Sequence, residues 1–233
     1  GGQQLGRVML HGATIVFVTP GYAGKRFIYE RAKELGVRSV IIDEPGSWAE
    51  GLVGAGVIAK FLPLNLERDS EAVLADCVSA VRGLARDPEM GMPAGVCTFC
   101  ELSVPLVARL AEALGLPGPS SKAVDTARDK HKTRGAMRAA GLPSPECFKV
   151  ECADDLAAAA KKVGFPAVLK PLNGAASLGV KKVASENELR RSYDEVCKEM
   201  QETVVTSGAL VKKDPGADSP PPEKVDFLFE EYL

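Results

Sequence analysis

The feature that most constrains the fold is an alternation of apolar runs and amphipathic segments over residues 13–115. A short continuous apolar run is typical of a strand buried on both faces of a parallel sheet. A segment with apolar residues three and four apart is typical of a helix packed on such a sheet. We expect strands at 13–21, 37–46, 56–65 and 93–99, and helices at 25–36, 69–85 and 103–115. The alternation predicts a doubly wound, Rossmann-like α/β layer in the first half of the chain.

Two prolines and a glycine in "LPGPSS" (116–121) interrupt this pattern and indicate a domain boundary. The expected domains are therefore 1–117 and 118–233, the second of class α+β. A polar segment rich in glycine, proline and serine, 206–224, is expected to be a flexible loop. Within the second domain we expect helices at 122–141, 154–164 and 185–200, and strands at 145–151, 165–172, 178–184 and 225–233. The last of these helices is expected to begin with a capping box, with Ser185 as the N-cap and Glu188 at position N3.

Composition narrows the class of protein. Hydrophobic residues make up 45% and charged residues 26%, with a formal net charge of −2. A chain without a strong basic field is not expected to bind nucleic acid or an acidic membrane. The chain contains no apolar run near the roughly 20 residues of a membrane span. It begins with Gly rather than Met, which favours a fragment.

The six cysteines are irregularly spaced, which favours free thiols and a reducing, cytoplasmic setting. Cys97 and Cys100 form a CxxC pair, but a zinc site needs a second pair of ligands. We therefore interpret these two residues as small, partly buried side chains, and no metal ligand is predicted in this chain.

Lys170 ends an apolar strand and leads into a loop of small residues between two strands. A loop of this kind exposes backbone N–H groups, and a lysine beside it adds the compact positive charge that suits phosphate oxygens. The loop fits neither the Walker pattern nor the dinucleotide fingerprint, because no helix follows it. A plain β-hairpin with an incidental lysine is the alternative. The loop residues concerned are Asn173, Gly174, Ala175, Ala176, Ser177 and Gly179.

Three segments taken together resemble the ATP-grasp superfamily. They are "RDKHKTRGAMRAAGLPSP", "FPAVLKPLNGAASLGV" and "FLFEEYL", within residues 117–233. The first half resembles the Rossmann-like pre-ATP-grasp domain. The stretches "NGAASLGV", "LGLPGPS" and "RDKHKTR" are most similar to the amino-acid ligase branch, which includes carnosine synthase and bacterial dipeptide ligases.

The resemblance implies an ATP site. It places Lys130 at the first ATP lysine and Lys170 at the second, on the α- and β-phosphates. The loop from Asn173 to Gly179 would close over the triphosphate as a lid. An adenine clamp would be formed by Glu230, Glu231, Tyr232 and Leu233.

The resemblance also implies Mg²⁺, with metal ligands and a catalytic arginine expected beyond Leu233. No catalytic residue is identified within the chain itself, and the chain alone is expected to have little ligase activity. Arg134 and Lys132 are interpreted as solvated charges. Glu101 either lines a substrate cleft or is an acid at a helix N-terminus.

The expected function is that of an ATP-dependent carboxylate–amine ligase acting through an acyl phosphate. Its partners would be two small molecules, namely an amine and either an amino acid or another carboxylate. The sequence does not decide the oligomeric state, and a homo-oligomer is one of the alternatives. Two alternatives remain. One is an ATP-grasp carboxylase of the biotin-dependent type, and the other is a nucleotide-binding module without a ligase step.

Overall fold

The computed structural model describes residues 10–172, 178–201, 203–206, 209–212 and 225–233. By internal contacts the chain divides into two compact units, Gly1–Val124 and Asp125–Leu233. The chain passes from the first unit to the second within helix α6 (Ser121–Arg128). The boundary expected after residue 117 stays a prediction.

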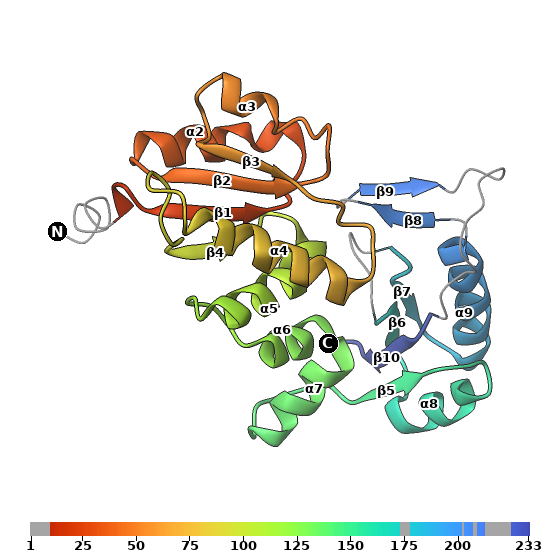
Figure 1. The fold of residues 1–233 in the computed structure, drawn as a ribbon. Helices are drawn as coiled ribbons and strands as arrows, with labels where there is room; N and C mark the ends of the chain where they lie inside the picture. The colour runs from red at the N-terminus through yellow and green to blue at the C-terminus, as the bar shows by residue number, and fades with distance from the viewer. Residues whose placement is uncertain (1–9, 173–177, 202, 207–208, 213–224) are drawn as a thin grey trace. The chain divides into compact units, whose positions relative to one another are not determined.

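The first unit is built on a parallel sheet with the strand order β3-β2-β1-β4 (Figure 1). Its strands are β1 (Thr14–Val18), β2 (Arg38–Asp43), β3 (Lys60–Pro63) and β4 (Gly95–Cys97). Its helices are α2 (Arg26–Glu34), α3 (Gly51–Gly54), α4 (Ser70–Leu84) and α5 (Val104–Leu114), with single 3-10 turns η1 (Ala23–Lys25) and η2 (Glu101–Ser103). The expected strand–helix alternation is confirmed.

Alternating side chains of β1 and β2 face two different cores. Val16 and Ile42 pack with α4 and α5, whereas Phe17 and Ile41 pack with Tyr29 of α2 and with the α3 region. Helices therefore cover both faces of the sheet, as Figure 1 shows. This explains why the central residues of these strands are apolar, because the middle of a strand buried on both sides has no solvent-facing positions.

The second unit is built on a sheet with the order β5-β10-β6-β7, in which neighbouring strands are antiparallel. Its strands are β5 (Cys147–Val150), β6 (Ala167–Pro171), β7 (Lys181–Val183) and β10 (Phe227–Glu231). Its helices are α7 (Lys130–Ala139), α8 (Asp155–Val163) and α9 (Glu186–Gln201), and a separate hairpin pairs β8 (Thr203–Thr206) with β9 (Ala209–Lys212).

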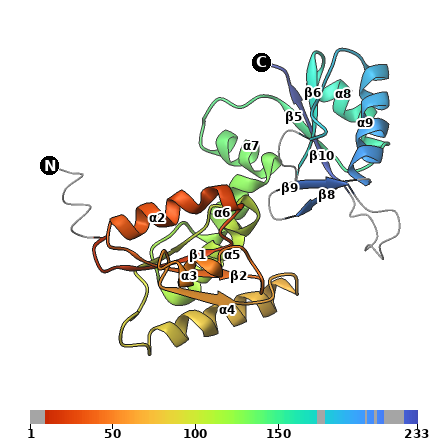
Figure 2. The same cartoon turned by 90° about the horizontal axis from the view of Figure 1, so that it is seen from above.

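The two faces of this second sheet are covered differently. Phe227, Phe229 and Leu169 pack with residues of α8 and α9 in the main core of the unit. Figure 2 shows these two helices beside the sheet. The alternate residues of β6 and β10, Lys170 and Glu230, therefore project from the opposite face. Helix α7 contacts that opposite face. One face of the sheet thus supplies stability, and the other carries the charged residues.

Most expected elements are confirmed, but the single helix expected over 122–141 is wrong. Asp129 has an extended backbone (φ −91°, ψ 109°) and separates α6 from α7. Its carboxylate accepts the N–H of Lys132 at 2.9 Å, and the Thr133 hydroxyl donates to the Thr126 carbonyl at 2.9 Å. Side chains thus satisfy backbone groups that a helix end leaves open, which makes the break stable.

Two further expectations need correction. Strand β9 lies inside the segment 206–224 that was expected to be a flexible loop, and 207–208 and 213–224 lie outside the described residues. The capping box at α9 forms in a shifted version. Glu188 N–H donates to the Ser185 hydroxyl at 3.3 Å, but the Glu188 carboxylate accepts from Ala184 N–H at 2.8 Å, one residue earlier than the motif predicts.

Replacing Asp129 tests the break between α6 and α7. Asp129→Ala removes the acceptor for Lys132 N–H and is expected to destabilise the protein by about 1 kcal/mol. Asp129→Asn keeps a side-chain oxygen at the cap and is expected to cost much less. Urea unfolding of both variants measures the difference. Equal stability of the two variants would show that the cap does not hold the break.

Replacing Leu156 tests where the second unit gains its stability. Leu156, on α8, is buried in the core against the sheet. Leu156→Ala is therefore expected to lower the free energy of unfolding by about 2–5 kcal/mol. Leu142→Ala, at an exposed leucine of the same unit, is the matched control and is expected to stay within about 0.5 kcal/mol of the natural protein. A small loss for Leu156→Ala, measured by chemical unfolding, would contradict the proposed core.

Candidate functional site

The candidate site is centred on the carboxylate of Glu230 in β10. In the register of β10 and β6, Leu228 lies opposite Lys170 and Glu230 lies opposite Val168. Glu230 and Lys170 are therefore diagonal neighbours on one face of the sheet, within reach of a long side chain. The Lys170 ammonium donates to Glu230 Oε1. The sheet register alone thus brings together two residues 60 positions apart.

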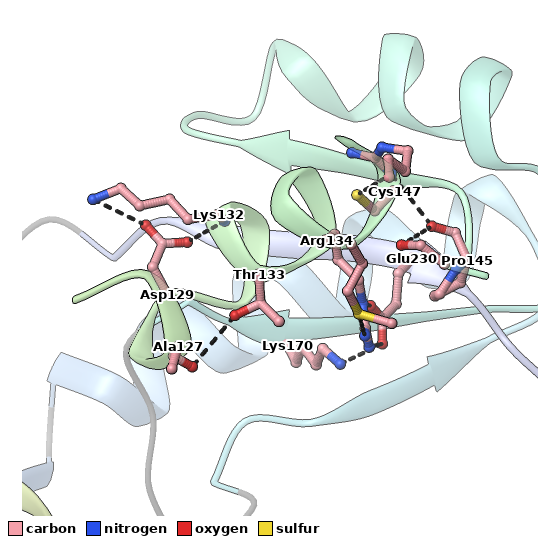
Figure 3. A network of polar contacts seen from close by, with 12 residues as sticks. Ala127, Asp129, Lys132, Thr133, Arg134, Pro145, Cys147, Lys170 and Glu230 are labelled. Atoms are coloured by element: carbon pink, nitrogen blue, oxygen red, sulfur yellow. Dashed lines mark hydrogen bonds and ion pairs between the residues drawn. The ribbon is translucent and has the colours of Figure 1, made fainter. Parts of the chain in front are cut away.

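Arg134 of α7 makes the second contact with this carboxylate. Its Nε donates to Glu230 Oε2 at 3.0 Å, and its Nη2 lies 3.4 Å from Oε1. Figure 3 shows Arg134 and Lys170 reaching Glu230 from the helix and from the neighbouring strand. Glu230 is only 7% exposed, and the Arg134 side chain is 24% exposed. The pair is therefore largely withdrawn from water.

Lys130 lies at the first residue of α7 and points to the end of β6. Its ammonium donates to the backbone carbonyls of Pro171 at 3.1 Å and Leu172 at 2.9 Å. These carbonyls stand immediately before the expected loop, so Lys130 fixes the point at which that loop leaves the strand. An ammonium has three donors, and two of those of Lys130 are used here.

The electrostatics of the group show that its charges influence one another. Burial lowers the pKa of the Lys130 ammonium, the positive charge of Lys170 lowers it further, and Asp129 and Glu230 oppose this only in part. Burial alone would raise the pKa of Glu230, but hydrogen bonds from Arg134 and Lys170 outweigh it, and the pKa is lowered. Glu230 is therefore ionised at neutral pH. Two cations pair with the Glu230 carboxylate, and Lys130 adds a third positive charge nearby, opposed by Asp129. The group therefore has a net positive charge, which suits an anionic ligand.

The backbone after Glu230 was expected to form a clamp for adenine. In the structure, two of its backbone N–H groups already donate to other parts of the protein. Glu231 N–H donates to the Glu146 carbonyl at 2.9 Å, and Tyr232 N–H donates to the Pro166 carbonyl at 3.2 Å. Within the described part of the chain, Leu233 N–H has no such partner, and this residue is exposed. Among the N–H groups of Glu231, Tyr232 and Leu233, that of Leu233 is therefore the one without a backbone acceptor in the described part of the chain.

Tyr232 is held by a contact that the sequence did not predict. The Lys182 ammonium, in β7, lies 3.6 Å from the centroid of the Tyr232 ring. A cation over an aromatic face is attracted by the ring quadrupole. The contact links the end of the segment 230–233 to the strand that follows the expected loop.

The structure thus brings Lys130, Lys170 and Glu230 into one group, as expected from the sequence, with Glu231, Tyr232 and Leu233 following on the same strand end. The loop residues Asn173, Gly174, Ala175, Ala176 and Ser177 lie outside the described residues. Gly179 is described, with φ +70°, and a Cβ there would lie 2.6 Å from Val196 Cγ1. Packing against α9 thus accounts for this glycine, and a ligand contact at Gly179 stays a prediction.

The interpretation of Arg134 as a solvated charge is wrong. Its side chain pairs with buried Glu230. The Lys132 side chain, in contrast, is 62% exposed, and its Nζ lies 3.8 Å from Asp129 Oδ2. One signal in the sequence could have found Arg134. It stands four residues after Lys130, and residues four apart lie on the same face of a helix. Since Lys130 was expected in the site, Arg134 was the neighbouring charge most able to reach it.

The residues that the structure describes do not form a metal site. Among the described residues, no group of three or more His, Cys, Asp or Glu is placed to hold a metal ion. The Glu230 carboxylate is already occupied by two cations, which makes it a poor ligand for Mg²⁺. In the same described ranges, no helix is long and apolar enough to span a membrane.

Comparisons with known proteins agree with this arrangement. The ATP-grasp N-terminal domain family matches residues 29–118, and the ATP-grasp domain family matches residues 163–213. Alanine--anticapsin ligase of Bacillus subtilis (strain 168) is 34% identical over 118 residues, which is 49% of this chain and 25% of that protein. Carnosine synthase 1 of Homo sapiens is 25% identical over 204 residues, which is 84% of this chain and 24% of that protein.

A solved structure gives the same result for the fold. The L-amino acid ligase from Bacillus licheniformis matches with a TM-score of 0.66 and 25% identity, over 95% of this chain and 46% of that one. This chain therefore spans about half the length of that ligase, and its matches cover about a quarter of the two curated relatives. With its matches to the ATP-grasp N-terminal domain and to the ATP-grasp domain, the chain belongs to the ATP-grasp superfamily, and the three relatives named here are a carnosine synthase and two ligases.

Proposed function

We propose that this chain contributes the lysine-bearing part of an ATP site to a ligase that joins the carboxylate of an amino acid to an amine. The observation that carries the proposal is the convergence of Lys130 and Lys170, 40 positions apart in the sequence, beside Glu230. The names of the relatives, an alanine--anticapsin ligase, a carnosine synthase and an L-amino acid ligase, support the same class of reaction.

Each lysine has a proposed role that follows from its contacts. Lys170 lies on the face of the sheet opposite the apolar core, and its ammonium would bind the α- and β-phosphates. Lys130 uses two donors on the Pro171 and Leu172 carbonyls, which leaves one for a phosphate oxygen. Since it also fixes the start of the loop 173–179, Lys130 would couple loop position to phosphate binding. The loop residues 173–177 and Gly179 are proposed as the lid.

The base would bind at the segment 230–233. Leu233 N–H is the available donor, and a neighbouring carbonyl would accept from the adenine amino group. Tyr232, with Lys182 on its ring, would hold the segment in place. Glu230 is not proposed as a direct ligand of the base, because Arg134 and Lys170 already occupy its oxygens.

Bound ATP would supply the γ-phosphoryl group that activates the carboxylate as an acyl phosphate, which an amine then attacks. The residues of this chain would contribute by neutralising and positioning the phosphates, which is the main protein contribution to phosphoryl transfer. Mg²⁺ is part of the proposal for the whole protein, with its ligands outside the described residues. The six cysteines are free thiols, which supports a reducing, cytoplasmic setting for an enzyme with small-molecule substrates.

Replacing Lys170 tests the phosphate contact. In the full-length protein, Lys170→Ala is expected to weaken ADP binding by roughly ten- to a hundredfold, because a charge-assisted contact with phosphate is lost. Lys161→Ala removes an exposed lysine of α8 and is the matched control, with no change expected. Calorimetric titration of ADP measures both variants. An unchanged dissociation constant for Lys170→Ala would remove the basis for this site.

The reaction itself is tested by product analysis on the full-length protein. ATP with a panel of amino acids is expected to give ADP and phosphate together with a dipeptide or amide, detected by mass spectrometry. Added hydroxylamine is expected to yield a hydroxamate, because it traps an activated carboxylate. Release of AMP and pyrophosphate would contradict the proposal. ADP release that requires bicarbonate and biotin would favour the carboxylase alternative, and nucleotide binding without turnover would favour the binding module.

A further inference from the structure

Arg134 shares the carboxylate of Glu230 with Lys170, the lysine that is proposed to bind phosphate. Lys170 and Arg134 both neutralise the Glu230 carboxylate, which is only 7% exposed. If Lys170 is to bind a phosphate, its ammonium must turn away from Glu230 at least in part. A buried carboxylate left without a partner is strongly unfavourable, so the cost of releasing Lys170 depends on what else holds Glu230.

Arg134 is placed to keep the Glu230 carboxylate paired without Lys170. Lys170 contacts Glu230 Oε1 alone, whereas Arg134 spans both oxygens, with Nε 3.0 Å from Oε2 and Nη2 3.4 Å from Oε1. A guanidinium fork that reaches both oxygens of a carboxylate also fixes its orientation. Glu230 would therefore stay paired and in place when Lys170 leaves it.

Arg134 is poorly placed to bind a phosphate itself. Two of its nitrogens point at Glu230, and the third, Nη1, lies 3.8 Å from Met137 Sδ within the same helix. Figure 3 shows the guanidinium facing the Glu230 carboxylate. Lys170, in contrast, contacts one oxygen of that carboxylate through a single nitrogen.

We propose that Arg134 is a positioning residue for Lys170: by holding the Glu230 carboxylate, it allows the Lys170 ammonium to transfer from Glu230 to the phosphates of the nucleotide. The inference rests on the proposed function, since it presupposes that Lys170 binds phosphate. Glu230 then acts as the resting partner of Lys170 between rounds of nucleotide binding, and Arg134 sets how readily Lys170 is released.

The test compares ADP with adenosine, because only ADP has phosphates for Lys170 to bind. Arg134→Gln leaves Lys170 as the sole counter-charge of Glu230, so ADP affinity is expected to fall roughly tenfold relative to adenosine affinity. Arg134→Lys restores a charge without the fork and is expected to recover only part of the ratio. Lys132→Gln, an exposed charge on the same helix, is the control and is expected to change nothing. Calorimetry gives the ADP affinity and competition gives the adenosine affinity.

The decisive variant is the double substitution Arg134→Gln with Glu230→Gln. With the carboxylate neutralised, Lys170 is no longer retained, so the ratio of ADP to adenosine affinity is expected to return toward that of the natural protein. A ratio as low as that of Arg134→Gln alone would overturn the inference and indicate a direct phosphate contact. Equal losses of ADP and adenosine affinity in Arg134→Gln would overturn it in favour of a purely structural role.

The failure of this inference and that of the proposed function are distinguishable. If Lys170→Ala leaves ADP affinity unchanged, the phosphate site itself is wrong. If Lys170→Ala weakens ADP binding while Arg134→Gln does not, only the positioning role of Arg134 is wrong. Urea unfolding of every variant confirms that each comparison is made between folded proteins.

Discussion

The buried carboxylate of Glu230 is the constraint on which the charged face of the second unit depends. A carboxylate this far from water must be paired, and the pairing partners come from a helix and from the adjacent strand. Arg134 and Lys170 therefore fix α7 against β6 and β10, and Lys130 adds two bonds from the start of the same helix to the end of β6. One ionised group thereby sets the positions of Arg134 and Lys170, and two backbone carbonyls at the end of β6 set that of Lys130.

The apolar face of the sheet, more than this network, is expected to supply the stability of the unit. Buried ion pairs contribute little net stability, because desolvation offsets most of their attraction. The apolar face of the same sheet, with Phe227, Phe229 and Leu169 packed on α8 and α9, already supplies a core. A set of charges that is costly to bury and contributes little net stability is best explained by what it does for a ligand. The division of the sheet into an apolar face and a charged face thus separates stability from function.

The sequence predicts what is determined locally. Continuous apolar runs identified the parallel strands, because their residues face helices on both sides. The extended break at Asp129 was missed, since helix-favouring residues continue on both sides of it, and apolar spacing does not detect a cap. Strand β9 was missed because a segment rich in glycine, proline and serine resembles a loop in composition. Lys170 and Lys130 were found because each stands beside a segment with a recognisable pattern of its own.

Arg134 shows where such prediction ends. Its partner is 96 residues away, and an arginine on a helix has the same local sequence whether it faces water or a buried carboxylate. Only the register of β10 and β6 decides that Glu230 projects toward α7 rather than into the core, and a shift of one residue would reverse this. The charge of Arg134 therefore acquires its role from the pairing of two strands in which it takes no part. Long-range register, more than any motif, turns three separate cations into one site.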